Sequence, residues 1–186
     1  MDRFRRFVEG FINPLGMLFV KFHVSPNILT LISFLLALLS SIQIFFGNIV
    51  MGGLIFLISG FIDVLDGFVA RLGGSVSKLG GFLDSVLDRF SDAIILSSII
   101  YSGLCDLGFG LFVLVGGFMV SYIRCRGEFF GVSLAGVGFA ERSERIIILS
   151  LGLMLDQIQL SMYILSFLIA LTIIERLYNV IKFLVV

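Results

Sequence analysis

Residues 63–71 read DVLDGFVAR and residues 80–88 read GGFLDSVLD, in a chain of 186 residues that is 59% hydrophobic. Asp63 and Asp66 are three residues apart and Asp84 and Asp88 are four apart, so each pair lies on one face of a helix. An ionised aspartate at the centre of a bilayer costs about 2.5–3.5 kcal/mol, so four unpaired ones would cost on the order of 10 kcal/mol. A divalent cation in a water-filled cavity would offset that cost, and we interpret this stretch as the functional site.

The composition is typical of a protein embedded in lipid. Charged residues make up 14% of the chain, against roughly a quarter in soluble domains, and the mean hydropathy is +1.14. The net charge is zero, which gives no basic field for nucleic acid, so we predict no nucleic-acid partner. The two cysteines, Cys105 and Cys125, lie at opposite ends of one predicted helix, and we expect no disulfide between them.

Six apolar segments follow a polar N-terminal stretch. Residues 2–22 have the pattern of an interfacial amphipathic helix, which Pro14 would bend or break, and no signal-peptide cleavage pattern follows closely. The predicted membrane-spanning helices cover residues 27–46, 51–72, 80–102, 108–127, 142–157 and 159–184. We therefore predict an all-α integral membrane protein with six transmembrane helices, preceded by the amphipathic helix, in a single domain of residues 1–186.

The basic residues are distributed asymmetrically along the chain. Arginine and lysine occur before the first predicted span, between the second and third, around the connection of the fourth and fifth, and towards the end of the last. The opposite connections, near Gly47, Asp106 and Asp156, contain neither. By the positive-inside rule we expect a multi-pass protein of the cell membrane with both termini in the cytoplasm. The four aspartates then lie at the cytoplasmic ends of the second and third spans, where soluble substrates can reach them.

The spacing D-x2-D-G-x2-A-R-x8-G-x3-D-x3-D, met here at every fixed position from Asp63 to Asp88, resembles the signature of the CDP-alcohol phosphotransferase family. The length of the chain, its six spans and its amphipathic N-terminal helix agree with that family. The resemblance implies a homodimeric six-helix enzyme whose active site opens to the cytoplasm. It also implies a reaction in which a CDP-linked lipid donates its lipid-phosphate group to an alcohol and releases CMP, with Mg²⁺ or Mn²⁺ as cofactor.

The resemblance also implies roles for individual residues. The metal ligands would be Asp63, Asp66, Asp84 and Asp88, and Asp88 could instead act as a general base. The residues bordering the CDP-lipid would be Asn27, Thr30, Asp66, Gly67, Ala70 and Arg71. Two alternatives stay open: Asn27 and Thr30 could simply cap a helix, and Arg71 could form a structural salt bridge with an aspartate.

Two further segments concern the acceptor alcohol. Residues 121–128, SYIRCRGE, and residues 138–145, GFAERSER, resemble segments of the phosphatidylinositol-phosphate synthase branch of the family, including its archaeal archaetidylinositol-phosphate relatives. In that branch, basic residues in these segments hold the phosphate of inositol phosphate, a role that suits the bidentate geometry of arginine. We predict Arg124, Arg142 and Arg145 as acceptor-phosphate ligands, and CDP-diacylglycerol or CDP-archaeol as the lipid donor.

Several other interpretations compete with this one. Arg124 with Glu128, and Arg145 with Glu141, have the spacing of i,i+4 helix pairs, which would be structural. Glycerol phosphate as the acceptor would also need basic residues, and a small cation transporter could use intramembrane carboxylates. Asp92 lies one helical turn beyond the motif, and we interpret it as an ion-pair partner rather than a metal ligand.

Overall fold

The computed structural model describes residues 16–185, and within that range it is helical without strands. A short helical segment at residues 16–21 precedes α2 (Pro26–Phe45), α3 (Ile49–Leu72), α4 (Lys78–Tyr101), α5 (Leu107–Phe129), α6 (Arg142–Met154) and α7 (Ile158–Val185). Both ends of each of these six helices lie within three residues of the predicted apolar segments. The predicted interfacial helix of residues 2–22 falls mostly, with Pro14, outside the described residues.

Four helices are long and apolar enough to cross a membrane, namely α2, α3, α5 and α7. α4 is 24 residues long, but it carries the charged side chains of Asp84, Asp88, Arg89 and Asp92. α6 has 13 residues and is about 20 Å long, short of the roughly 30 Å hydrocarbon core. The described chain is thus an all-helical membrane protein with four candidate membrane-spanning helices.

Local sequence explains where these helices begin and end. Pro26 is the first residue of α2, where its missing N–H costs no hydrogen bond, and Ser25 occupies the N-cap position. Asn27 and Thr30 therefore lie inside the helix and do not cap it. At the start of α4 the hydroxyl of Ser77 accepts a hydrogen bond of 3.0 Å from the Gly80 N–H, which caps that helix.

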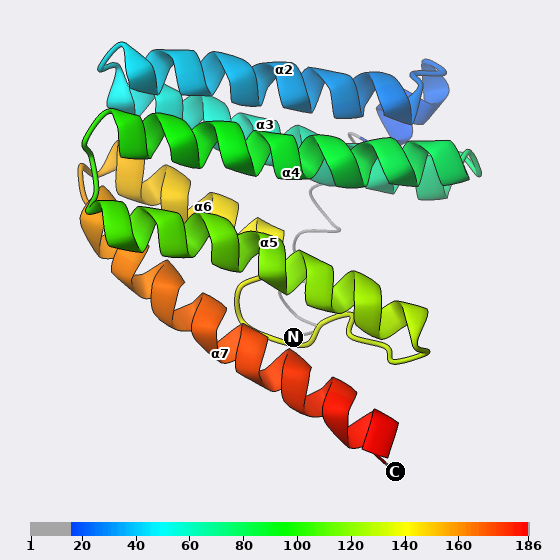
Figure 1. Ribbon diagram of the computed structural model, residues 1–186. Helices are drawn as coiled ribbons and strands as arrows, with labels where there is room; N and C mark the ends of the chain where they lie inside the picture. The colour runs from blue at the N-terminus through cyan, green and yellow to red at the C-terminus, as the bar shows by residue number, and fades with distance from the viewer. Residues whose placement is uncertain (1–15, 186) are drawn as a thin grey trace.

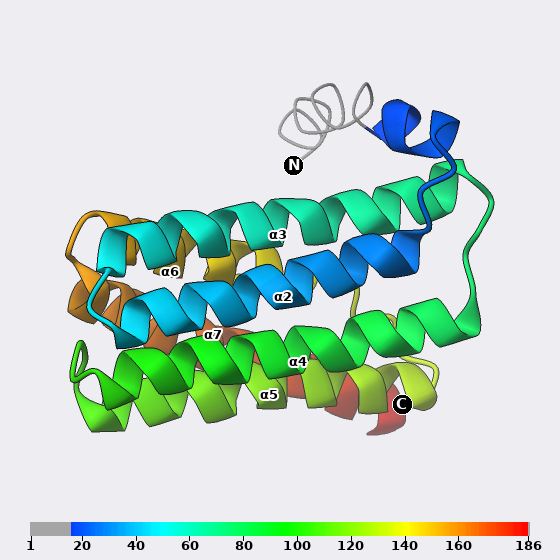
Figure 2. The same cartoon turned by 90° about the horizontal axis from the view of Figure 1, so that it is seen from above.

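The six helices pack as a closed ring. α2 contacts α3 and α4, α3 contacts α6, α6 contacts α7, and α7 contacts α5, which closes the ring on α4. Figure 2 shows α3, α2, α4 and α5 side by side in this order. The connections 73–77 and 130–141 lie at one end of the bundle with the end of α7 (Figure 1). We call this end the basic end, because arginine and lysine residues flank both connections. The short turns after α2, α4 and α6 lie at the other end.

The interior of the bundle is filled by aliphatic side chains, while large apolar side chains also cover its outside. Ile95 and Ile99 of α4 pack in one buried cluster with residues of the other helices, including Leu149 of α6 and Leu165 of α7. Large apolar side chains are exposed on every helix from α2 to α7. Such a surface is suited to lipid rather than to water. Both cysteines are free, as predicted.

Gly53 of α3 faces α6 so closely that no side chain fits between the helices. A Cβ atom there would lie 2.8 Å from Leu153 Cβ and 3.0 Å from the carbonyl oxygen of Ser150. We expect Gly53→Ala to lower the free energy of unfolding by about 1–3 kcal/mol, because overpacking forces the backbone to shift. Gly108→Ala in the first turn of α5 is the matched control, since a Cβ there meets nothing within 4 Å. Thermal unfolding in detergent compares the two variants, and equal melting temperatures would contradict this close packing.

Candidate active site

Three of the four motif aspartates meet between α3 and α4 towards the basic end. One carboxylate oxygen each from Asp63, Asp66 and Asp84 lies within 4.8 Å of the others. Asp66 is 4% exposed and accepts a hydrogen bond of 2.6 Å from the hydroxyl of Thr30 on α2. Asp63 and Asp84 are half-buried. The packing of the bundle therefore brings carboxylates from two helices to one point.

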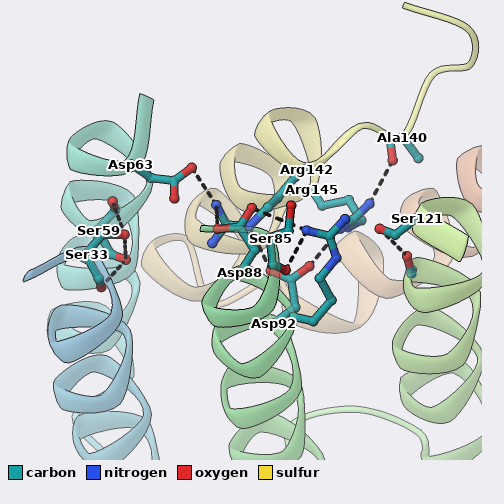
Figure 3. A network of polar contacts seen from close by, with 12 residues as sticks. Ser33, Ser59, Asp63, Ser85, Asp88, Asp92, Ser121, Ala140, Arg142 and Arg145 are labelled. Carbon is teal, nitrogen blue, oxygen red and sulfur yellow. Dashed lines mark hydrogen bonds and ion pairs between the residues drawn. The ribbon is translucent and has the colours of Figure 1, made fainter. Parts of the chain in front are cut away.

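Asp88 lies outside this group of three and contacts an arginine instead. The guanidinium of Arg142, at the first residue of α6, contacts Asp63 Oδ2 at 2.5 Å and Asp88 Oδ1 at 2.8 Å through Nη1. Its Nε lies 3.4 Å from Asp92 Oδ1. Figure 3 shows Arg142 between Asp63 on α3 and the two aspartates on α4. Arg142 thus links three carboxylates from two helices.

Arg145 is placed one turn further along α6 and is almost fully buried. Its Nη2 lies 2.7 Å from Asp92 Oδ2, and its Nη1 donates to the Ala140 carbonyl oxygen at 3.0 Å (Figure 3). The interpretation of Asp92 as an ion-pair partner is therefore confirmed. The alternative i,i+4 pair of Arg145 with Glu141 is wrong, because the Arg145 side chain points across the bundle towards α4.

Arg124 is further from the carboxylates than the other two predicted acceptor ligands. Its Nε lies 2.9 Å from Glu128 Oε1, so the i,i+4 pair between them is confirmed, and both side chains are solvent-accessible. Arg124 nevertheless lines the same cavity of about 1030 Å³ as Arg142 and Arg145. That cavity lies between α4, α5, α6 and α7, and Asp84, Asp88 and Ser121 also line it. All three predicted arginines therefore face one space beside the motif.

The residues predicted to border the CDP-lipid lie on the α2–α3 side of the aspartates. Arg71 is exposed, and its Nη1 lies 3.3 Å from the place where a Cβ of Gly67 would be. Among the described residues Arg71 makes no ion pair with an aspartate, so that alternative is not supported. The Asn27 side-chain oxygen lies 2.8 Å from the Cβ position of Gly80, so this motif glycine leaves room for Asn27. Ala70 is half-buried on α3.

Two residues of α7 support the site and were not predicted from the sequence. Arg176 is 2% exposed and donates hydrogen bonds to the carbonyl oxygens of Val120 at 2.8 Å and Val137 at 2.9 Å. Its Nη2 lies 3.5 Å from Glu141 Oε1. The Thr172 hydroxyl oxygen accepts hydrogen bonds from the backbone before α6. An arginine inside an apolar span is itself a signal of function, which could have identified Arg176.

The balance of charge at the site suits a divalent cation. Five carboxylates gather here, from Asp63, Asp66, Asp84, Asp88 and Asp92, and three guanidinium groups pair with them, from Arg89, Arg142 and Arg145. In their ionised forms these groups leave two negative charges without a partner. Carboxylate oxygens at the spacing of the three grouped aspartates are ligands for hard cations such as Mg²⁺ and Mn²⁺. The residues present therefore fit a divalent metal ion.

A membrane bundle that joins such a carboxylate group to an arginine-lined cavity has the features of an enzyme acting on phosphate compounds. The chain belongs to the CDP-alcohol phosphatidyltransferase family, whose family model matches residues 23–186. It is therefore a membrane transferase of phospholipid biosynthesis. Membership of this family excludes the cation-transporter interpretation.

Two relatives indicate which branch of the family the chain resembles. The chain is 39% identical to archaetidylinositol phosphate synthase of Pyrococcus horikoshii, over 96% of this chain and 95% of that protein. It is 38% identical to archaetidylinositol phosphate synthase of Methanothermobacter thermautotrophicus, over 82% of this chain and 76% of that protein. The predicted resemblance to this branch of the family is confirmed.

Solved structures share the fold. Phosphatidylinositol phosphate synthase of Mycobacterium tuberculosis, solved with CDP-DAG bound, matches with a TM-score of 0.77 and 24% identity, covering 91% of this chain and 92% of that one. The structure of the same enzyme in complex with manganese and citrate matches with a TM-score of 0.77 and 25% identity, covering 91% and 88%. The chain therefore shares its fold with that enzyme.

Proposed function

We propose that this enzyme transfers the lipid-phosphate group of a CDP-linked lipid to inositol 1-phosphate and releases CMP. The observation that carries the proposal is the cavity lined by Arg124, Arg142 and Arg145 directly beside the motif aspartates. An acceptor that brings its own phosphate needs such a cationic cavity, whereas an uncharged alcohol does not. The names of the two archaeal relatives support inositol phosphate as the acceptor and an archaeol-based lipid as the donor.

The metal site would consist of Asp63, Asp66 and Asp84. Their grouped oxygens support this assignment. The structure of the Mycobacterium tuberculosis enzyme in complex with manganese supports a divalent cation as the metal. A bound Mg²⁺ or Mn²⁺ would supply charge stabilisation for the diphosphate of the donor and for the departing CMP. Asn27, Gly67, Ala70 and Arg71 would border the nucleotide on the α2–α3 side, with the exposed guanidinium of Arg71 available to a phosphate.

Asp88 would be the general base rather than a fourth metal ligand. It lies outside the group of three, and it lines the cavity in which the acceptor would bind. A carboxylate there can take the proton from the attacking hydroxyl group. Arg142 contacts Asp88 at 2.8 Å, and an acceptor phosphate would offer that guanidinium a competing anion. Acceptor binding would thereby free Asp88 at the moment when a base is needed.

We further propose that all six helices span the membrane as one domain, with the basic end in the cytoplasm. The distribution of arginine and lysine supports this orientation. α6 is short, but Thr172 and Arg176 form hydrogen bonds with the non-helical backbone just before it, and backbone that packs against other parts of the protein is tolerated at membrane depth. The resemblance to the family supports a homodimer, in which the active site would open to both the cytoplasm and the lipid.

The acceptor assignment is tested by CMP release. Purified enzyme with Mg²⁺ and CDP-archaeol is offered inositol 1-phosphate, free inositol, glycerol 3-phosphate or serine. We expect turnover with inositol 1-phosphate alone, because only a phosphate-bearing acceptor of this size engages the arginines together with the cavity. Turnover with glycerol 3-phosphate instead would contradict the assignment of inositol 1-phosphate as the acceptor, while the family and the proposed metal site would be unaffected.

Arg124→Gln tests the cavity without disturbing the carboxylates. We expect this substitution to raise the KM for inositol 1-phosphate about 10- to 100-fold, the loss of one charge-assisted hydrogen bond. Glu128→Gln is the matched control, because it breaks the same ion pair and keeps the guanidinium. The KM for CDP-lipid and the melting temperature should stay unchanged in both variants. Equal KM values for the acceptor in the two variants would exclude Arg124 from phosphate binding.

A further inference from the structure

Thr30 makes a buried contact with the motif that the spacing of the motif does not contain. Its hydroxyl lies 2.6 Å from Asp66 Oδ2, and the two side chains are 6% and 4% exposed. Asp66 belongs to α3 and Thr30 to α2, so the contact crosses the interface between two helices. A carboxylate this deeply buried needs hydrogen-bond donors, and Thr30 is such a donor among the described residues.

The Thr30 hydroxyl has a second acceptor within reach, and the geometry favours the carboxylate. The Pro26 carbonyl oxygen, four residues earlier in α2, lies 3.1 Å away. Threonine in a helix commonly donates to that position. A hydroxyl has one proton, and the shorter contact, to a charged acceptor, is the stronger of the two. The proton therefore belongs to the bond with Asp66.

The interface between α2 and α3 is built to keep these two side chains together. The Ser33 and Ser59 hydroxyl groups each donate to the backbone carbonyl oxygen of the other residue, at 3.0 and 2.8 Å (Figure 3). Further from the site, Ser40 donates to the Gly52 carbonyl oxygen at 2.7 Å. These bonds fix the two helices against sliding, because any shift in register would break them all. Thr30 is thereby held in a constant place beside Asp66.

We propose that Thr30 is a positioning residue that orients the Asp66 carboxylate for the metal. The bond occupies part of Oδ2 and restricts rotation of the carboxylate, so the Asp66 oxygen that lies near the oxygens of Asp63 and Asp84 keeps its place. Hydrogen-bond partners of this kind commonly change metal affinity 10- to 100-fold. The inference rests on the proposed metal site. It replaces the direct contact with CDP-lipid that the family resemblance implies for Thr30.

The test is a titration of the full-length enzyme with Mn²⁺ in detergent without nucleotide. Electron paramagnetic resonance measures the free Mn²⁺ at each step and so gives the Kd. Thr30→Val keeps the shape of the side chain and removes the hydroxyl, and we expect the Kd for Mn²⁺ to rise about 10- to 100-fold. Thr30→Ser keeps the hydroxyl and should bind Mn²⁺ as the wild type does. Ser33→Ala is the matched control, because it removes a buried hydroxyl from the same interface without touching an aspartate.

Three other outcomes would each overturn the positioning role of Thr30 for a different reason. Unchanged Mn²⁺ affinity in Thr30→Val, with a raised KM for CDP-lipid, would overturn the positioning role in favour of a nucleotide contact. Equal loss of affinity in Thr30→Val and Ser33→Ala would overturn it in favour of general weakening of the interface. Failure of the wild-type enzyme itself to bind Mn²⁺ would refute the proposed metal site, and with it this inference.

Discussion

Asp84→Asn is expected to abolish both CMP release and Mn²⁺ binding while the protein stays folded. Asp84 contributes one of the three grouped oxygens, and it makes no ion pair among the described residues. The amide therefore removes a negative charge from the metal site without breaking a contact that holds helices together. Loss of a hydrogen-bond partner of a metal ligand raises the Kd by up to about 100-fold. Asp84 would be a ligand itself, so we expect its loss to raise the Kd for Mn²⁺ by more than about 100-fold. Equilibrium binding of Mn²⁺ and CMP release measure the two effects.

Asp92→Asn is the control for this experiment. Asp92 carries the same charge on the same helix, but it contacts Arg142 and Arg145 instead of the grouped aspartates. Breaking such a largely buried pair costs about 3–5 kcal/mol, so this variant should melt at lower temperature and still bind Mn²⁺. If Asp92→Asn lost the metal and Asp84→Asn kept it, the ligand set would have to be assigned again.

Much of the fold could be predicted because lipid imposes a simple pattern on the sequence. Long apolar runs interrupted at Pro26, Gly47 and Asp106 mark helices with little ambiguity, since a lipid-exposed chain must satisfy its backbone within each helix. The spacing of the motif likewise indicates which carboxylates share a helix face. These are local properties, and the helices follow from them, as does the position of Asp63 and Asp66 on one face of α3. The meeting of these two aspartates with Asp84 of α4, without Asp88, depends on how the helices pack.

The neighbours of each helix could not be predicted in the same way. α2 contacts α4 as well as α3, and α3 contacts α6, although α4 and α5 lie between them in the chain. Such neighbours depend on where small residues such as Gly53 allow close approach, and on many weak contacts summed over the bundle. These small residues can be identified in the sequence, but the residues that they contact on other helices cannot.

The partner of Arg145 was also beyond the sequence, although the i,i+4 pair of Arg124 with Glu128 was predicted correctly. Glu141 and Arg145 have the right spacing for a helix pair, yet Glu141 is the residue just before α6 and lies near Arg176 of α7. Arg145 is drawn to Asp92 on α4 because a buried guanidinium requires a nearby carboxylate. Spacing rules apply to isolated helices on a surface, and inside a bundle the partner from another helix is favoured.

Asp88→Asn is expected to reduce the turnover number for CMP release by a factor of about 10²–10⁴ and to leave Mn²⁺ binding near that of the wild type. Asparagine keeps the shape of the side chain and an oxygen for the 2.8 Å contact with Arg142, but it cannot accept the proton of the attacking hydroxyl group. Single-turnover CMP release at saturating substrates isolates the chemical step.

The comparison with Asp84→Asn decides between the two roles that the motif allows for Asp88. A base is needed only during reaction, so its loss should lower the turnover number while the KM for both substrates stays constant. A metal ligand is needed before reaction, so its loss should weaken Mn²⁺ binding as Asp84→Asn does. Because Asp88 contacts Arg142 and lies outside the group of three, we expect the first result. Weaker Mn²⁺ binding in Asp88→Asn would instead make Asp88 a fourth metal ligand. Its contact with Arg142 would then have to break when the metal binds.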